Sequence, residues 1–546
     1  MPLTVPSVPA TRTNPSTHVA HALVDYLSWQ GVRHVFLVPG MQIDPLVKAL
    51  ATHPAVTPIV ANHESAAGYM ADGYARARGG MGATFAIGGP GSANLIGAAV
   101  AAKADRSAVL FVTGNIPFVA QGREEFQDAG PSGSNDVEVF RAALGVSLCC
   151  ERAQDLPLAL AQATLQLASR QPVHLAIAMD VQLAACAMAP ARDSLVPPEP
   201  AAPPGTPAPD WLTRGRVLLV VGADALPLAD VIASAARRFT LAVVSDAGAR
   251  GIVPEDAVQS LGHLGFMPHP RACAALDGAE PLRAEHVVAL GCDDALQKLL
   301  GSRHPSVQVL SPAVFSHWLR GDPPSPDDAS QSDRLHWLRQ LGHLHRPLSR
   351  ACAGATEPMP YARVVDAVAA ALPSEASYVI DAGQVRRIAV SRLHCLQPAT
   401  LFVAEGMAPM GWSLGASIGV HLARPDRPVV AMLGDGAMRM HGIELATAAR
   451  YQLPILYVLF DNCAYGSVLA RMGTETEVDT ARLPSVDWCG FAAALGVEAH
   501  RANNPAALQR ALAGAHALRG PRLIVASVPA VEPDAYGSNT GIGWGP

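Results

Sequence analysis

The residues of this sequence that most clearly indicate a chemistry are an aspartate and an asparagine, each of which follows an apolar run. Asp435 lies in a Gly-Asp-Gly triplet directly after the run 429–433, and Asn462 follows a second run at 455–460. A helical segment separates the runs, and a strand–helix–strand unit makes its two strands parallel. Both side chains are therefore predicted at one carboxyl edge of a sheet, where open α/β sheets bind ligands.

The types of these residues suggest what they would bind. Carboxylate and amide oxygens are hard donors that suit Mg²⁺, which usually keeps phosphate oxygens and water as its other ligands. Gly434 and Gly436 let the backbone approach a phosphate closely, and the helix after Gly436 points its first N–H groups at the same place. The stretch therefore predicts a cradle for Mg²⁺ and a diphosphate. The alternative is an ordinary glycine-rich strand-to-helix turn, with Asn462 capping a turn.

The triplet, with Asn462 placed 27 positions after Asp435, resembles the diphosphate-binding motif of the thiamine diphosphate (ThDP) enzymes. The resemblance is to the acetolactate synthase-like and 2-oxo acid decarboxylase group. It implies that Asp435, Asn462 and the backbone carbonyl of Ala464 bind the metal. It also implies cofactor contacts from the flanking residues Gly434, Gly436, Ala437, Tyr465 and Gly466. Most members carry Asn where this chain has Asp461, but the position of the ligand is kept.

A second motif, HESAAGYMADGYARARG from His63 onward, resembles the glutamate motif of the same enzymes. It implies that Glu64 is the catalytic carboxyl group, which exchanges a proton with N1′ of the aminopyrimidine ring of ThDP. Taken by itself, Glu64 could equally be a glutamate at a helix N-terminus that favours the helix dipole. A zinc-protease motif is excluded, because position 67 is Ala67 rather than His.

Three further cofactor contacts are implied by the resemblance. Met410 lies 25 residues before Asp435 in the stretch EGMAPMGWSLGASIG, where a bulky apolar side chain supports the bent form of ThDP. The carbonyl of Ala408 would hold the amino group of the pyrimidine ring. Gln384 lies in a segment that resembles the one contacting the diphosphate from the other side. Without the resemblance, Met410 would be interpreted as a core methionine.

Other positions narrow the activity. Phe126 and Gln127 occupy the place of a Phe-Gln pair near the reacting centre of acetolactate synthases, which makes Gln127 a candidate catalytic residue. The alternative is a core phenylalanine followed by a surface glutamine.

The histidines that decarboxylating members carry near the reacting centre are missing, so carboligation is favoured. FAD is not expected, because residues 291–295 read Gly-Cys-Asp-Asp-Ala where flavin-binding members carry an Arg-Phe-Asp-Asp-Arg-like segment.

The resemblance therefore implies a ThDP- and Mg²⁺-dependent enzyme that decarboxylates a small-molecule 2-oxo acid and transfers the acyl-anion equivalent to a carbonyl acceptor. A 2-oxo acid decarboxylase or C–C lyase that does not ligate, and a non-catalytic ThDP-binding protein, are the alternatives. In this family the cofactor lies between the first domain of one subunit and the third domain of another. A homodimer or homotetramer with shared active sites is therefore expected.

Three blocks of alternating strands and helices must position these residues. The pattern predicts an α/β fold of three consecutive doubly wound parallel-sheet domains, and the first and third blocks share their order of elements. The expected parts are a flexible leader at 1–16, a pyrimidine-binding domain at 17–188, a Pro-rich linker at 189–212, a central α/β domain at 213–345, a linker at 346–358, a diphosphate-binding domain at 356–535 and a tail at 536–546.

Composition excludes several other classes of protein. The 546 residues carry 40 Lys and Arg against 46 Asp and Glu, a net charge of −6, which does not suggest a nucleic-acid partner. No apolar run reaches transmembrane length and the N-terminus lacks a signal-peptide core, so no membrane partner is expected. The nine cysteines form no Cys-x-x-Cys pair, which favours reduced thiols and a cytoplasmic location.

Overall fold

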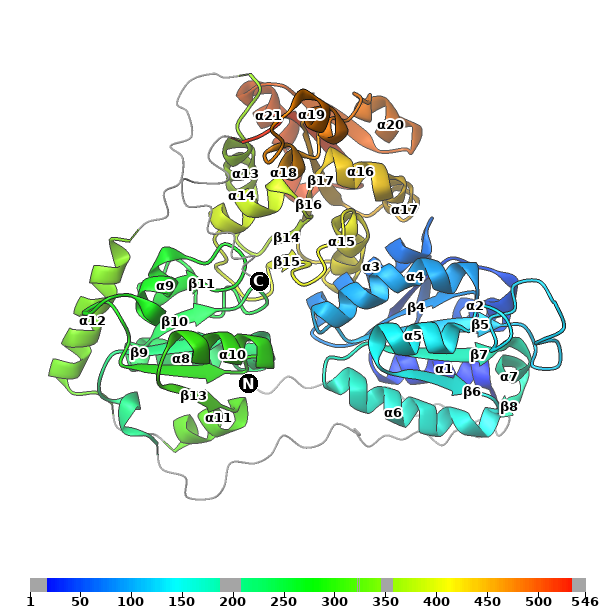
Figure 1. The fold of residues 1–546 in the computed structure, drawn as a ribbon, viewed down its shortest axis with the longest axis horizontal. Helices are drawn as coiled ribbons and strands as arrows, with labels where there is room; N and C mark the ends of the chain where they lie inside the picture. The colour runs from blue at the N-terminus through cyan, green and yellow to red at the C-terminus, as the bar shows by residue number, and fades with distance from the viewer. Residues whose placement is uncertain (1–16, 187–207, 322, 324, 345–356, 533–546) are drawn as a thin grey trace. The chain divides into compact units, whose positions relative to one another are not determined.

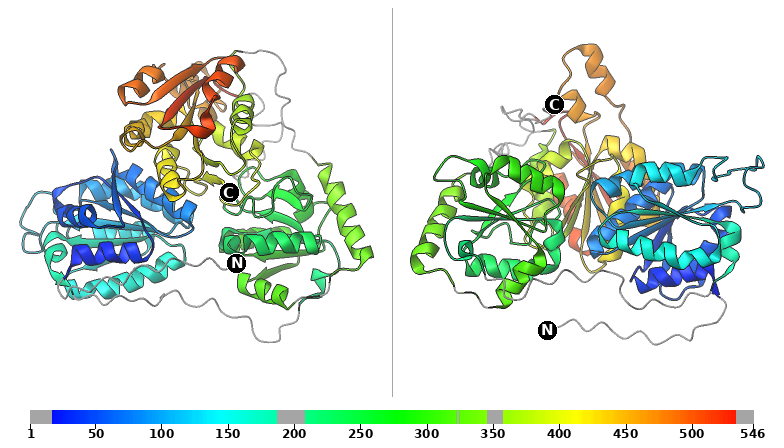
Figure 2. Two further views of the ribbon diagram at one scale, coloured as in Figure 1. Left: turned by 180° about the vertical axis from the view of Figure 1, so that it is seen from behind. Right: turned by 60° about the horizontal axis from the view of Figure 1, so that its bottom comes forward.

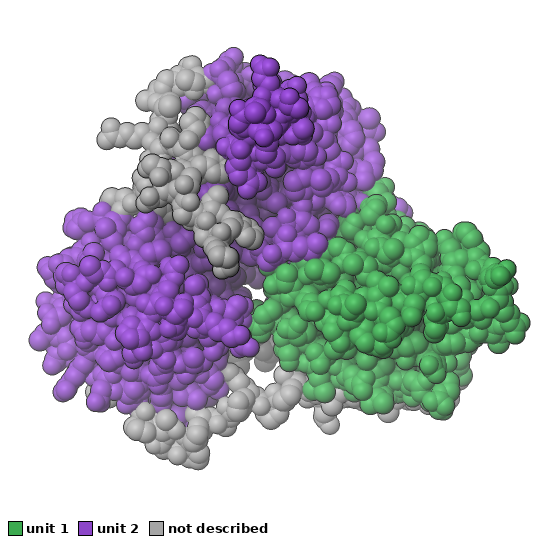
Figure 3. Space-filling view, in the orientation of Figure 1, with its two compact units in different colours: residues 1–68, 81–196 green, residues 69–80, 197–546 purple. Residues whose placement is uncertain are grey.

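The computed structural model describes residues 17–186, 208–321, 323, 325–344 and 357–532 (Figure 1). The expected leader, most of both linkers and the tail at 536–546 lie outside the described residues. The chain divides into two compact units, residues 1–68 with 81–196 and residues 69–80 with 197–546 (Figure 3).

The first unit is built on a parallel sheet of six strands in the order β3-β2-β4-β5-β7-β6. Its strands are β2 (His34–Leu37), β3 (Thr57–Val60), β4 (Gly82–Ala86), β5 (Val109–Asn115), β6 (Ser147–Cys150) and β7 (Val173–Ala178). Its helices are α1 (Val19–Trp29), α2 (Asp44–Thr52), α4 (Pro90–Ala104), α5 (Asp136–Leu144), α6 (Leu156–Ala168) and α7 (Met179–Leu183). Strands β1 (Thr17–His18) and β8 (Ala185–Cys186) pair antiparallel. All of β5 is buried, as expected for a central strand with helices on both faces.

The second unit contains two sheets, of which the first has the order β11-β10-β9-β12-β13. Its strands are β9 (Val217–Val221), β10 (Ala242–Ser245), β11 (Ser260–His263), β12 (His286–Leu290) and β13 (Val307–Leu310). Helices α8 (Ala229–Arg238) and α11 (Pro312–Arg320) pack on one face, and α9 (Pro270–Asp277), α10 (Asp294–Arg303) and α12 (Asp328–Gly342) pack on the other (Figures 1 and 2). Alternate strand residues face the two helix layers, because side chains alternate along a strand.

The other sheet of this unit has the order β15-β14-β16-β17-β19-β18. Its strands are β14 (Ser377–Ile380), β15 (Leu401–Val403), β16 (Val429–Gly434), β17 (Ile455–Asp461), β18 (Glu498–Ala502) and β19 (Arg522–Ser527). Helices α13 (Tyr361–Ala370), α14 (Gln384–Arg392) and α21 (Pro505–Leu512) share one apolar cluster with it. The remaining helices are α15 (Trp412–Ala423), α16 (Asp435–His441), α17 (Leu445–Arg450), α18 (Gly466–Leu469), α19 (Glu475–Ala481) and α20 (Trp488–Ala494).

The three large sheets confirm the predicted fold class, since every strand pair in them is parallel. The sheet of the first unit and the β15–β18 sheet have the same topology. Numbered along the chain within each sheet, both orders read 2-1-3-4-6-5. The shared order of elements in the first and third blocks is therefore confirmed.

Helix α3 (Glu64–Arg78) runs from the first unit into the second. From Tyr69 onward it packs against α15 at very close range. A Cβ on Gly73 would lie 2.3 Å from the carbonyl oxygen of Ala416, and one on Gly419 would lie 1.9 Å from that of Met70. Only glycine fits at both crossing points. The segment 69–80, which the sequence groups with the first block, thus packs on the third.

Polar contacts fix the same helix pair. The indole Nε1 of Trp412 donates to Oδ2 of Asp72 over 2.8 Å. Arg76 donates to both carboxylate oxygens of Asp72, over 2.7 and 2.8 Å, and to the carbonyl of Val403 over 2.9 Å. Asp72 is fully buried, so these partners supply the hydrogen bonds that a buried carboxylate requires.

Within the described ranges, no helix combines the length and hydropathy needed to cross a membrane. The eight cysteines in the described part of the chain are free thiols.

Candidate functional site

Asp435 lies where β16 ends and α16 begins. Strand β16 pairs with β17 so that Gly434 lies opposite Phe460, which places Asp435 beside Asp461. Asp435 is only 1% exposed. Its Oδ1 accepts a hydrogen bond from the backbone of Gly436 over 3.0 Å, whereas its buried Oδ2 has no hydrogen-bond partner among the described residues. Such an oxygen is costly to bury, so a missing positively charged partner is indicated.

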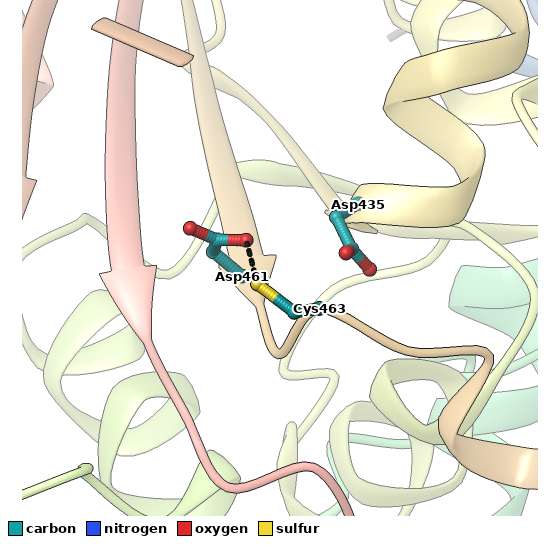
Figure 4. Close-up of side chains that lie close together, drawn as sticks. All are labelled: Asp435, Asp461 and Cys463. Atoms are coloured by element: carbon teal, nitrogen blue, oxygen red, sulfur yellow. Dashed lines mark hydrogen bonds between the residues drawn. The ribbon is translucent and has the colours of Figure 1, made fainter. Parts of the chain in front are cut away.

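The surroundings of Asp435 disfavour its charge. Burial raises the pKa of this carboxyl group to about 6, the nearby carboxylate of Asp461 adds to the rise, and Arg439 acts in the opposite direction. The carboxylates of Asp435 and Asp461 and the thiol of Cys463 each offer one donor atom, and these atoms lie within 4.8 Å of one another (Figure 4). The edge of the sheet therefore gathers oxygen and sulfur donors around one point.

Asn462 and Ala464 follow β17 at the same carboxyl edge. The side-chain Oδ1 of Asn462 accepts from the backbone N of Ala464 over 3.3 Å, and its Nδ2 donates to the carbonyl of Ala530 over 2.9 Å. Between them Cys463 has φ +50°, a left-handed conformation that turns the chain sharply. The edge predicted for Asp435 and Asn462 is thus present, since both residues follow neighbouring parallel strands.

Glycines leave room beside these side chains. A Cβ on Gly434 would meet no atom within 4 Å among the described residues. A Cβ on Gly436 would lie 2.7 Å from Cε1 of Tyr465 and 3.4 Å from Cε of Met410. Three of the predicted cofactor contacts, Met410, Gly436 and Tyr465, are thereby brought together. Ala437 follows them, buried in the first turn of α16.

A second group of predicted contacts meets at Gly466. A Cβ there would lie 2.8 Å from Nδ2 of Asn462 and 2.9 Å from Cδ of Gln384. Gln384 is 4% exposed, and its Oε1 accepts from the backbone N of Glu532 over 3.3 Å. Its Nε2 has no hydrogen-bond partner in the described part of the chain. A buried amide donor of this kind is suited to an anionic ligand.

Ala408 lies in the loop between β15 and α15. Its φ is +50°, a left-handed conformation that is uncommon for a residue with a side chain. Strained backbone of this kind often occurs at ligand sites, where the surrounding structure holds it in place. A constrained loop of this kind is consistent with a contact between the Ala408 carbonyl and a cofactor, which stays a prediction.

Glu64 belongs to the first unit and is the first residue of α3. Its Oε2 accepts from Nδ2 of Asn94 over 2.9 Å, and its Oε1 lies 3.4 Å from the position that a Cβ on Gly91 would take. Both neighbours belong to the first turns of α4. The carboxylate is half-buried, so it remains open to a ligand on one side.

Gln127 lies in a loop of the first unit with φ +58°. Its carbonyl accepts from Nε2 of the buried Gln42 over 2.9 Å, and Oε1 of Gln42 accepts from the backbone of Gly88 over 2.7 Å. A pocket of about 620 Å³ lies between Gln127 and the first turn of α4. Phe126 is 77% exposed, so the alternative in which Phe126 is a core residue is wrong.

Comparison with known proteins shows the family. The protein-family model described as "Thiamine pyrophosphate enzyme, N-terminal TPP binding domain" matches residues 17–133 of the sequence. The model described as "Thiamine pyrophosphate enzyme, C-terminal TPP binding domain" matches residues 381–526. The chain belongs to the thiamine diphosphate-dependent enzymes. Within that superfamily it falls in the acetolactate synthase-like group, and it is a ThDP-dependent carboligase or decarboxylase.

Relatives in this superfamily match along most of their length. The acetolactate synthase isozyme 1 large subunit of Escherichia coli is 26% identical, with 94% of each chain covered. The probable acetolactate synthase large subunit of Methanocaldococcus jannaschii is 26% identical over 89% of this chain and 88% of its own. The probable 2-ketoarginine decarboxylase AruI of Pseudomonas aeruginosa is 27% identical, with 82% of each chain covered.

The residues of the second unit fit a ThDP enzyme's diphosphate and its divalent ion. Oδ2 of Asp435 and Nε2 of Gln384 are buried polar atoms without hydrogen-bond partners among the described residues. The carboxylate oxygen is an acceptor and the amide nitrogen is a donor. No side chain of the described residues lies within 4 Å of the position that a Cβ on Gly434 would take. A cation would satisfy the carboxylate, and phosphate oxygens would satisfy the amide.

Two residues at this site were not predicted as donors, Asp461 and Cys463. The sequence suggested only that Asp461 replaces a usual asparagine. Strand alternation would not have found them, because β17 ends at Asp461 and Cys463 beyond it has a left-handed φ of +50°. The usable signal was that both residues flank Asn462, at the end of the strand that pairs with the one before Asp435.

Proposed function

We propose that this ThDP-dependent enzyme binds its cofactor through Mg²⁺ or a similar divalent ion, decarboxylates a 2-oxo acid and transfers the acyl-anion equivalent to a carbonyl acceptor. One observation carries the proposal: a fully buried carboxylate oxygen of Asp435 lacks a partner among the described residues, beside a glycine that faces open space. Such an arrangement suits a metal-bound diphosphate.

In this proposal the second unit holds the charged end of the cofactor. Asp435, Asn462 and the carbonyl of Ala464 bind the metal. The amide of Gln384 and the backbone at Gly434 and Gly436 approach the diphosphate, and Ala437, Tyr465 and Gly466 complete the contact surface. Met410 supports the ring system, and the carbonyl of Ala408 accepts from its amino group. When bound, ThDP supplies an electron sink for decarboxylation at its thiazolium ring.

Glu64 is proposed to exchange a proton with the pyrimidine ring of the cofactor. Its position at the start of α3 and its hydrogen bond from Asn94 orient the carboxylate while leaving one side open. A carboxyl group that holds or releases one proton at a defined atom is what this step requires.

Carboligation is proposed over plain decarboxylation for two reasons. The histidines that decarboxylating members carry near the reacting centre are missing from the sequence, so no imidazole group at those positions can deliver a proton to the intermediate. The pocket beside Gln127, of about 620 Å³, offers room for a second carbonyl compound. The second candidate is a 2-oxo acid decarboxylase, which is favoured by the similarity to the probable 2-ketoarginine decarboxylase.

The activity is tested with purified full-length protein, ThDP and Mg²⁺. Release of CO₂ from a panel of 2-oxo acids is measured with and without an aldehyde acceptor, and products are identified by mass spectrometry. Longer carbon skeletons in the presence of acceptor support carboligation, whereas free aldehyde alone supports the decarboxylase. Glu64→Gln is expected to reduce turnover to near background while circular dichroism shows a folded protein. Full activity in that variant would refute the role of Glu64.

We also propose a cytoplasmic homodimer or homotetramer in which each active site combines two subunits. Light scattering measures the assembly. Mixing inactive Glu64→Gln with inactive Asp435→Asn under conditions that exchange subunits then tests the shared site. Recovery of activity is expected, because one kind of site in the mixed dimer contains neither substitution. No recovery after proven exchange would contradict sharing.

A further inference from the structure

One side chain beside Asp435, the thiol of Cys463, differs chemically from what a magnesium site needs. Mg²⁺ takes hard oxygen ligands and retains several waters. The cluster here contains two carboxylates, from Asp435 and Asp461, and the thiol of Cys463, all within 4.8 Å of one another. Thiolate is a soft ligand that favours zinc and related transition metals. The donor set is therefore broader than a magnesium site requires.

Local backbone geometry explains how Cys463 reaches the cluster. Cys463 follows Asn462 and precedes Ala464, the two residues proposed to bind the metal. Its left-handed conformation, φ +50°, turns its side chain back toward the end of β17. The thiol Sγ then lies 3.9 Å from Oδ1 of Asp461 (Figure 4). Oδ2 of Asp461 lies 3.6 Å from Nη1 of Arg501, so the other oxygen is turned toward the thiol.

A separate observation indicates that the cluster has a ligand. Asp435 is 99% buried, since 1% of it is exposed, and its Oδ2 has no partner among the residues described. Figure 4 shows Asp435 at the start of α16, across from Asp461 and Cys463 at the end of β17. Donors at about 2.0–2.3 Å from a tetrahedral ion lie about 3.5 Å from one another. The three donor atoms, which lie within 4.8 Å of one another, would therefore move together by about 1 Å to share an ion.

We propose that Asp461 and Cys463 add their side chains to the donor set of Asp435, so that this site binds Co²⁺ or Zn²⁺ more tightly than Mg²⁺. The proposal rests on the proposed function, because it concerns the ion that would hold the diphosphate. Two carboxylates favour any divalent cation, and the sulfur donor gives the preference for transition metals. Coordination through sulfur displaces the thiol proton to solvent.

Cobalt provides a direct test, because sulfur coordination to Co²⁺ produces charge-transfer absorption in the near ultraviolet. Metal-free full-length protein is titrated with Co²⁺ and its absorption recorded. The band is expected in the unsubstituted protein and absent in Cys463→Ser. Cys273→Ser, which removes a half-buried thiol of the central domain, serves as the matched control and should retain it. No band in the unsubstituted protein, or the same band in Cys463→Ser, would overturn the proposal.

Competition between Mg²⁺ and bound Co²⁺ is the second test of the proposal. A hundredfold excess of Mg²⁺ is expected to leave most of the Co²⁺ bound. Asp461→Asn is expected to weaken Co²⁺ binding by at least roughly tenfold, because even groups that only support metal ligands contribute on that scale. Displacement of Co²⁺ by equimolar Mg²⁺ would count against the proposal.

ThDP binding is followed separately by circular dichroism. If Mg²⁺ supports ThDP binding but cobalt shows no sulfur band, only this inference fails. If neither ion supports ThDP binding, the proposed function itself fails.

Discussion

The carboxylate of Asp381 holds the backbone of Gly411, with 2.9 Å between Oδ1 and the backbone nitrogen. The same carboxylate accepts from Ala382 N over 2.9 Å and from Ser413 N over 2.8 Å. It therefore fixes the start of α15 and the end of the loop that carries Met410. Burial raises the pKa of Asp381, and these backbone donors act against the rise.

Replacing Asp381 by Asn should loosen this loop. The amide group offers one oxygen in place of two, so at least one buried N–H loses its acceptor, at a cost of about 1–3 kcal/mol in unfolding free energy. Urea unfolding measures that loss, and ThDP titration should show weaker binding because Met410 is less well fixed. Asp366→Asn is the control, since Asp366 is 44% exposed in its pair with Arg392 and exposed pairs contribute at most about 1 kcal/mol. Equal losses in both variants would contradict the role given to Asp381.

Asp435→Asn should stabilise the metal-free protein while preventing cofactor binding. The pKa of Asp435 is raised to about 6 from an ordinary value of 3.8, so the native state binds the proton more tightly than the unfolded state. Its contribution to stability is therefore present below pH 3.8 and lost as the pH rises through 6. At pH 7.5 the variant should be more stable by roughly 1–3 kcal/mol, with little difference near pH 4. Urea unfolding at both values checks this, and a less stable variant at pH 7.5 would disprove it.

Gly434→Ala should separate folding from cofactor binding. Gly434 has φ −88° and ψ 166°, an extended conformation that alanine adopts readily, and its Cβ would meet no atom within 4 Å among the described residues. Unfolding free energy should therefore change by less than about 1 kcal/mol. ThDP affinity should fall at least roughly tenfold, because a methyl group would fill space proposed for the diphosphate. Gly342→Ala, whose Cβ is equally open but lies in α12, should bind ThDP normally. Unchanged affinity in Gly434→Ala would argue that the diphosphate lies elsewhere.

His174 should make the first unit sensitive to acid. Its ring stacks on Phe140 with centroids 3.8 Å apart, and its nitrogens pair with Thr113 and Ser147 over 2.8 and 2.7 Å. Burial lowers its pKa to about 3 from 6.5. Below pH 6.5 the unfolded state binds a proton at His174 that the native state does not bind until about pH 3. The free energy of unfolding therefore falls by about 1.4 kcal/mol for each pH unit between these values.

The measurement is the unfolding free energy between pH 7.5 and 4.5. His174→Gln keeps hydrogen-bonding groups but cannot be protonated, so its stability should decline less steeply with falling pH. His500→Gln is the control, because His500 is 42% exposed beside Glu498. If His174→Gln and the unsubstituted protein show parallel slopes, His174 does not determine acid sensitivity.

The sequence predicted those parts of the fold and site that depend on local patterns. Apolar runs gave β16 and β17, and parallel pairing put Asp435 and Asn462 at one edge. The start of α4 has no such pattern, because the helix begins at Pro90 directly after Gly89, whose φ is +67°. Local propensity cannot reveal such a backbone conformation, since it is set by the surrounding loop.

The contacts that escaped prediction join residues distant in sequence. Asp381 meets Gly411 across 30 positions, and Asp72 meets Trp412 across 340. No periodicity in the sequence connects them, because each depends on the final arrangement of several elements. Cys463 is different, since its strained backbone makes the donor cluster possible and a strained φ angle has no clear sequence signature.

The packing of α3 against α15 determines where the chain can be truncated without exposing buried residues. A fragment ending at residue 188 would contain Asp72 and Gly73 but lack Trp412 and Ala416, against which they are packed. The excised piece would expose a buried acid and a bare helix face to solvent. We expect such a truncation to aggregate on expression, whereas a split gene supplying both halves together should yield soluble material.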